Sequence, residues 1–171
     1  MYRIHIAGQR ALLFIVSLVA LLPFVLAACG STGGSAPGTG STPTPTPTTV
    51  QGYGTAHGCL SDVVVTPAPP AANVTVKMTD ANTTVTAHIG DVIEIQLPFG
   101  LRWTGSTTSG GGLQLQTPAG YASTATGMCI WRFSASSAGT THLTFFARAI
   151  CQKDQYCPQF VLAIPITIVV K

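Results

Sequence analysis

The stretch that decides the fold is Thr84–Pro98, TVTAHIGDVIEIQLP. Its second half alternates along the chain, and one face is formed by Ile93, Ile95 and Leu97. A period of two predicts a half-buried strand over 91–97, because successive side chains of a strand point to opposite faces. Gly90 can adopt positive φ and marks a turn over 88–91, in which the Asp91 carboxylate is expected to accept a hydrogen bond. The stretch therefore predicts strand, turn and strand.

The same alternation recurs further along the chain, whereas helix signals are nearly absent. A long closing strand is expected over 160–170, with Pro165 at an edge or a bulge. The Gly-rich segment 106–112 is predicted to be a long loop. Together these patterns predict an all-β fold, an antiparallel β-sandwich of about seven strands. Its expected aromatic core residues are Trp103, Trp131, Phe133 and Phe145.

The N-terminus reads as an export signal. Two arginines precede an apolar run, and the run ends in Leu26-Ala27-Ala28-Cys29. This ending resembles the lipobox of bacterial lipoproteins, in which the cysteine is lipidated and the peptide before it is removed. The resemblance implies a signal peptide over 1–28 and an extracytoplasmic protein held on a membrane through Cys29. A transmembrane anchor is the alternative, since about 18 apolar residues approach the length needed to span a bilayer.

A linker and one domain follow the predicted cleavage site. Residues 29–52 are mostly Gly, Ser, Thr and Pro, a composition that predicts a disordered linker. Residues 53–171 have the size of one domain. After Cys29 the chain has six basic and five acidic residues, and no basic run suggests nucleic-acid binding.

The domain contains four cysteines, and an even number in an exported protein suggests disulfides. Sequence alone allows three pairings. We favour Cys151 with Cys157 as a local clip, which leaves Cys59 with Cys129. Neither Cys-x-x-Cys nor a histidine pair at ligand spacing is present, so we expect no metal site and no cofactor.

Two segments resemble the chagasin-type inhibitors of papain-like cysteine proteases. One is Thr84–Pro98 with the following Gly100-Leu101-Arg102-Trp103, and the other is Ser137–Phe145, SAGTTHLTF. The resemblance covers most of 84–170 and implies the Ig-like sandwich of that family, with a cysteine protease as partner.

The family binds its target through three adjacent loops, and each is altered in this chain. Only Phe99 and Gly100 stand where the first loop would fall, while the second matches only at Gly127 and the third only at Arg148. A loop flanked by Cys151 and Cys157 takes the place of the family's continuation.

No catalytic grouping is evident, so we expect no enzyme. Aromatic residues on rigid loops often anchor partners, and the disulfide would order the last loop. The candidate binding residues are Phe99, Gly100, Tyr121, Gly127, Arg148 and Tyr156. Three functions follow as hypotheses: a lipid-anchored module that binds a protein or extracellular ligand, a papain-like protease inhibitor, and a structural envelope domain. For Arg148 the alternative to binding is a structural role, in which its side chain caps an exposed strand face.

Overall fold

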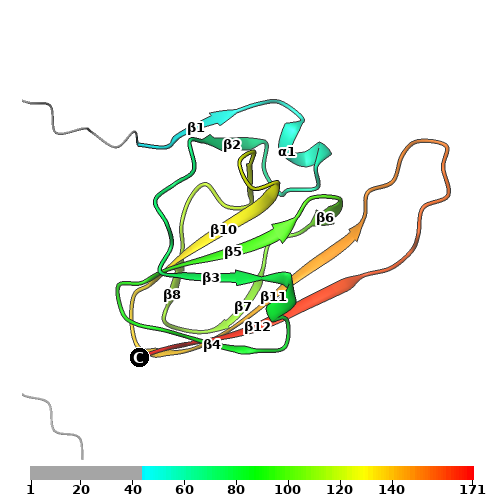
Figure 1. Cartoon of the computed structure of the whole chain (residues 1–171). Coiled ribbons are helices and arrows are strands. Elements are labelled where there is room, and N and C mark those ends of the chain that lie inside the picture. Colours follow the sequence, from blue (N-terminus) through cyan, green and yellow to red (C-terminus); the bar gives the residue numbers. More distant parts are fainter. Residues whose placement is uncertain (1–43) are drawn as a thin grey trace, which may run out of the picture. The chain divides into compact units, whose positions relative to one another are not determined.

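A computed structural model describes residues 44–171, and the predicted signal peptide, Cys29 and most of the predicted linker lie outside them. The described part is built from two sheets packed face to face (Figure 1). The larger sheet contains β1 (Thr46–Thr49), β2 (Val63–Thr66), β3 (Val74–Lys77), β5 (Val92–Pro98), β8 (Leu113–Leu115), β9 (Tyr121–Ser123) and β10 (Met128–Ala135). The smaller sheet contains β4 (Thr84–Ala87), β6 (Leu101–Trp103), β7 (Thr107–Gly110), β11 (Gly139–Ala149) and β12 (Leu162–Val170). The predicted all-β sandwich is confirmed.

The order of the strands shows how the chain crosses between the layers. The larger sheet runs β1-β2-β9-β10-β5-β3 with β8 also on β10, and the smaller runs β4-β12-β11-β6 with β7 also on β11. Most pairs are antiparallel, but β2 with β9, β3 with β5 and β4 with β12 are parallel. The sheets are therefore mixed, unlike the wholly antiparallel prediction, because these parallel partners are joined by long stretches of chain rather than by hairpins.

The core lies between the two sheets and is formed by the alternating residues predicted from the sequence. Ile93, Ile95 and Leu97 of β5 are fully buried. Trp131 of the larger sheet meets Phe145 of the smaller sheet edge to face, with ring centroids 5.2 Å apart. The prediction that four aromatic residues are core is confirmed, since each is at most 2% exposed: Trp103, Trp131, Phe133 and Phe145.

The turn between β4 and β5 also forms as predicted. Gly90 has φ of 92°, and the backbone N–H of His88 donates to Asp91 Oδ2 at 2.7 Å. Pro165 lies in β12, but β4 pairs only with Thr167–Val170 of that strand. At Pro165 the strand therefore has β11 as its sole strand partner, and the Pro165 carbonyl accepts a hydrogen bond from the backbone N–H of Asn82 at 2.7 Å on the other side.

Two segments predicted to be irregular are strands instead. Thr46–Thr49 lies within the predicted linker, yet it pairs with β2 as the outermost strand of the larger sheet. Thr107–Gly110 lies within the predicted loop, yet it pairs with β11. All residues of both strands are exposed, so backbone pairing rather than side-chain burial holds them. A pattern of apolar residues cannot reveal such strands.

Two short helical segments complete the described part, α1 (Tyr53–Ala56) and the 3₁₀ turn η1 (Met78–Asp80). The favoured disulfide pairing is confirmed: Cys59 is bonded to Cys129, and Cys151 is bonded to Cys157. The Cα atoms of each pair are 5.3 Å apart. Cys59 and Cys129 are buried and join the segment after α1 to the larger sheet.

Candidate functional site

Three connections meet at one end of the sandwich, and we call them together the loop end. They are residues 99–100 between β5 and β6, residues 124–127 between β9 and β10, and residues 150–161 between β11 and β12. Strand register brings them together, because Pro98 is opposite Met128 and Leu101 is opposite Ala149. The backbone N–H of Phe99 also donates to the Gly127 carbonyl at 3.4 Å. The three loops are therefore adjacent, as the resemblance stated for the sequence implies.

The segment around α1 is a fourth part of the loop end, and sequence reasoning missed it. The His57 ring stacks on Phe99 with centroids 4.6 Å apart, and the rings of Tyr53 and His57 form an edge-to-face pair with centroids 4.5 Å apart. The backbone of this segment also accepts hydrogen bonds from Gly100 and Trp103. Phe99 is consequently half-buried beneath His57 rather than freely exposed. In the sequence, only the expected pairing of Cys59 with Cys129 indicated that the chain near residue 59 returns to the loop end.

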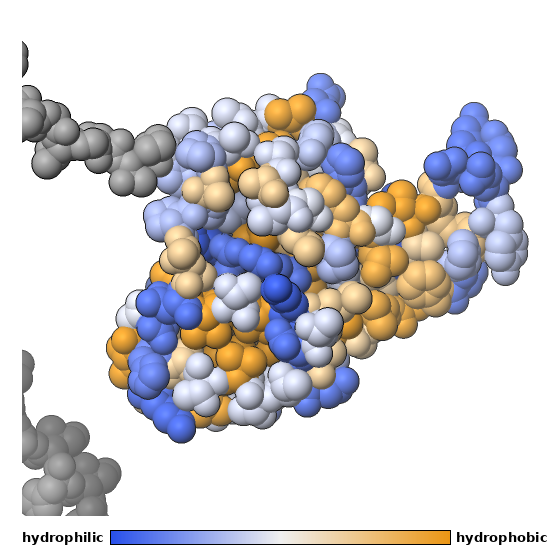
Figure 2. Space-filling view, in the orientation of Figure 1, coloured by the Kyte–Doolittle hydropathy of each residue, from blue (hydrophilic) through white to orange (hydrophobic). Residues whose placement is uncertain are grey.

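The connection between β11 and β12 extends away from the sheets (Figure 1). Its disulfide closes the part of the connection from Cys151 to Cys157, within which Tyr156 is 92% exposed. Phe160 and Val161, which follow the disulfide, are also exposed. Figure 2 shows apolar surface toward the base of this projection and hydrophilic surface at its tip. The aromatic side chain of Tyr156 therefore takes no part in the packing of the domain.

Tyr121 is not a loop residue, which corrects the prediction that it could contact a partner. It begins β9 and is 3% exposed, packed in a small cluster with Val65 and Ile130. Burial, together with the negative charge of Glu94, raises the pKa of Tyr121 to about 12. The sequence could not show this burial, because it is the pairing of β9 with β2 and β10 that covers the side chain.

Arg148 lies on the outer face of the smaller sheet, on the side that strand parity predicted. It is exposed, as are His142 on the same face of β11 and Arg102 on the neighbouring strand β6. The register places Arg148 directly opposite Arg102. Two positive side chains therefore stand next to each other beside the base of the third loop.

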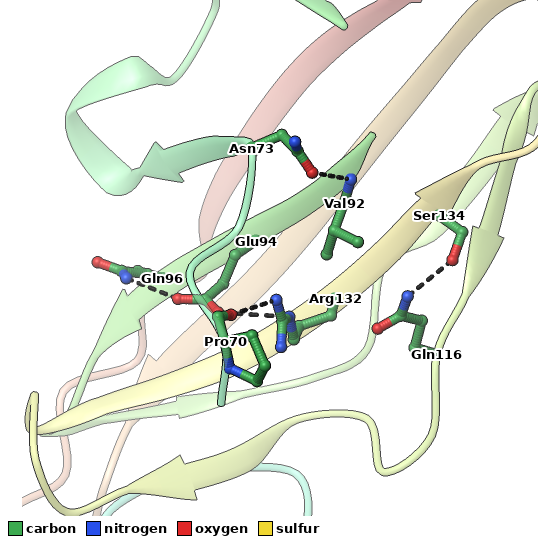
Figure 3. Close-up of polar contacts among 8 residues, drawn as sticks. All are labelled: Pro70, Asn73, Val92, Glu94, Gln96, Gln116, Arg132 and Ser134. Atoms are coloured by element: carbon green, nitrogen blue, oxygen red, sulfur yellow. Dashed lines mark hydrogen bonds and ion pairs between the residues drawn. The ribbon is translucent and has the colours of Figure 1, made fainter. Parts of the chain in front are cut away.

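A polar cluster covers the outer face of the larger sheet (Figure 3). The Arg132 Nε lies 3.5 Å from Glu94 Oε2, and Arg132 Nη2 donates to the Pro70 carbonyl at 2.8 Å. Gln96 donates to the other oxygen of Glu94 at 2.7 Å. The hydrogen bond from Arg132 to Pro70 fastens the proline-rich segment 66–72 to the sheet. Glu94 faces Arg132, and the cluster has a structural role.

Among residues 44–171 no three His, Cys, Asp or Glu side chains are grouped so that they could hold a metal ion. No helix in the same range has the length and apolar character needed to cross a bilayer.

Comparison with known proteins gives only distant similarities. The chain matches no protein-family model and no curated protein. Among solved structures it is similar to the cysteine protease inhibitor EhICP2 from Entamoeba histolytica, with 14% identity and a TM-score of 0.40 over 57% of this chain and 94% of that one. It is also similar to amebosin, with 12% identity and a TM-score of 0.34 over 59% of this chain and all of that one. The fold assignment rests on the sheet topology described above.

Proposed function

We propose that this protein is a binding module that holds a protein partner at its loop end. The observation that carries the proposal is Tyr156, an aromatic side chain 92% exposed within a loop closed by a disulfide. Tyrosine buries a large area at small entropic cost when it binds, and a closed loop has less freedom to lose. The sandwich supplies the rigid frame on which such loops commonly bind partners. The proposal includes no catalytic activity and no cofactor.

Photo-cross-linking tests the proposal directly. A photoreactive phenylalanine would replace Tyr156 in the cell, with Thr75 as the matched control, since Thr75 is exposed on β3 away from the loops. We expect a discrete adduct with one protein from position 156 and none from position 75. Equal labelling at both positions, or none at position 156, would refute the proposal.

We also propose that the module is lipid-anchored outside the cytoplasm through Cys29. The lipobox-like ending Leu26-Ala27-Ala28-Cys29 supports this, and so do two disulfides, which are typical of exported proteins. Two acyl chains suffice to hold a small domain on a membrane. Cells given radiolabelled palmitate should label the natural protein and not the Cys29→Ser variant. Label in that variant would contradict the anchor.

Inhibition of a papain-like cysteine protease is the second candidate function. One observation favours it: the connections 99–100, 124–127 and 150–161 meet at one end, as the chagasin-type resemblance requires. The first connection has only two residues, and Phe99 lies beneath His57, so the third loop would make most of the contact. Titration of papain with the purified protein tests this candidate. Full activity at a large excess of the protein would exclude papain as a target and leave the cross-linking test unaffected.

A further inference from the structure

Arg102 and Arg148 form an unusual pair on the outer face of the smaller sheet. They are directly opposite each other on neighbouring antiparallel strands, and both are exposed. Side chains at such positions lie close enough to interact, and two like charges there repel each other. The register therefore places two like charges where they repel each other, and a neutral residue at either position would remove that repulsion.

The acidic side chains of the domain do not compensate this pair. Among residues 44–171 no ion pair joins either arginine to a carboxylate. Four of the five carboxylates in that range already hold backbone N–H groups or another arginine, and these are Asp62, Asp80, Asp91 and Glu94. The fifth, Asp154, lies in the third loop and forms no ion pair with Arg102 or Arg148. Both guanidinium groups thus remain available to an anion from outside.

Two separate hollows are lined by Arg102, and we call them together the arginine groove. The first, of about 230 Å³, is also bordered by Arg148 and by the exposed Phe160 and Val161. The second, of about 310 Å³, is also bordered by Trp103 and the exposed Leu60. Each hollow therefore combines positive charge with exposed apolar side chains.

We propose that the arginine groove binds an extended acidic segment of the protein partner, which has one carboxylate between apolar side chains. This inference rests on the proposed function and specifies the chemistry of the partner. A guanidinium group presents a planar set of N–H donors that matches a carboxylate, and two such groups can hold one acid between them. Binding replaces the repulsion between the arginines with attraction to the shared anion, and the flanking hollows accept the neighbouring side chains.

A random heptapeptide phage library, selected on the full-length protein in detergent, tests the inference. We expect selected peptides to be enriched in Asp or Glu with apolar residues on both sides. The Arg102→Gln/Arg148→Gln variant should lose this enrichment, and its affinity for a selected peptide should fall about tenfold or more. The matched control, Lys77→Gln/Lys171→Gln, removes the same charge at other exposed positions and should select the same peptides. Melting temperatures verify that both variants fold.

The outcomes separate this inference from the function on which it rests. Selection of the same acidic peptides by natural protein and arginine variant, or no acidic enrichment at all, would overturn the groove. Binding to phosphatidylglycerol vesicles that needs both arginines, without selection of acidic peptides, would also overturn it and assign the pair to lipid. A cross-link at position 156 would still support the proposed function in each case. Acidic selection without that cross-link would support the groove and refute the role of Tyr156.

Discussion

Replacing both Cys59 and Cys129 with alanine should lower the free energy of unfolding by about 4.4 kcal/mol, since this disulfide closes a loop with a sequence separation of 70. The value follows from the loop-closure entropy that the cross-link removes from the unfolded chain. Alanine suits the buried positions, because serine would leave an unpaired hydroxyl there. A domain of this size has roughly 5–15 kcal/mol of stability, so the loss is a large share of it. The segment carrying His57 should also detach from Phe99 more readily.

Equilibrium urea unfolding, followed by tryptophan fluorescence, measures this loss well, because Trp103 and Trp131 are buried in the core. The other disulfide provides the comparison. The Cys151→Ala/Cys157→Ala variant opens a loop with a separation of only 6, so it should lose about 2 kcal/mol. A loss below about 1 kcal/mol for the first pair, or a larger loss for the second pair, would refute the loop-entropy reasoning.

Three further predictions concern charge. Burial raises the pKa of Tyr121 to about 12 in the folded protein, against an ordinary value of 10.0. The stability that comes from its neutral form is therefore complete below pH 10 and is lost as pH rises through the folded value. The urea midpoint of the natural protein should fall between pH 10 and 12, and that of Tyr121→Phe should fall by a smaller amount. Hydrogen bonds from Thr55 lower the pKa of Asp62. The stability that its carboxylate contributes is therefore present above the ordinary pKa and is lost as pH falls through the lowered pKa of the folded protein. Acid unfolding of Asp62→Asn should show a weaker pH dependence than that of the natural protein. Arg148→Gln should raise the unfolding free energy by about 0.2–1 kcal/mol at low salt by removing repulsion from Arg102, and 1 M NaCl should abolish the gain.

The candidate site was only partly predictable. Tyr156 was identified because it lies between two cysteines close in sequence, a local feature. Phe99 was placed in the correct connection, but its cover by His57 depends on a segment more than 40 residues earlier. Tyr121 was misassigned for the same reason, since its burial comes from β2, which precedes it by about 55 residues. The arginine groove was not predicted from the sequence, because 46 positions separate Arg102 from Arg148.

The sequence by itself determined the elements whose side chains are sorted by burial. The alternation in β5 and the aromatic core positions reflect strands with one buried face, so a period of two reveals them. The turn is revealed by Gly90, which has positive φ. Tertiary structure alone decided the exposed strands β1 and β7, the place of α1 and the pairing of the two arginines. Each of these depends on register between distant segments. Backbone hydrogen-bonding groups are the same in every residue except proline, so where no face is buried the pairing leaves no pattern in the sequence.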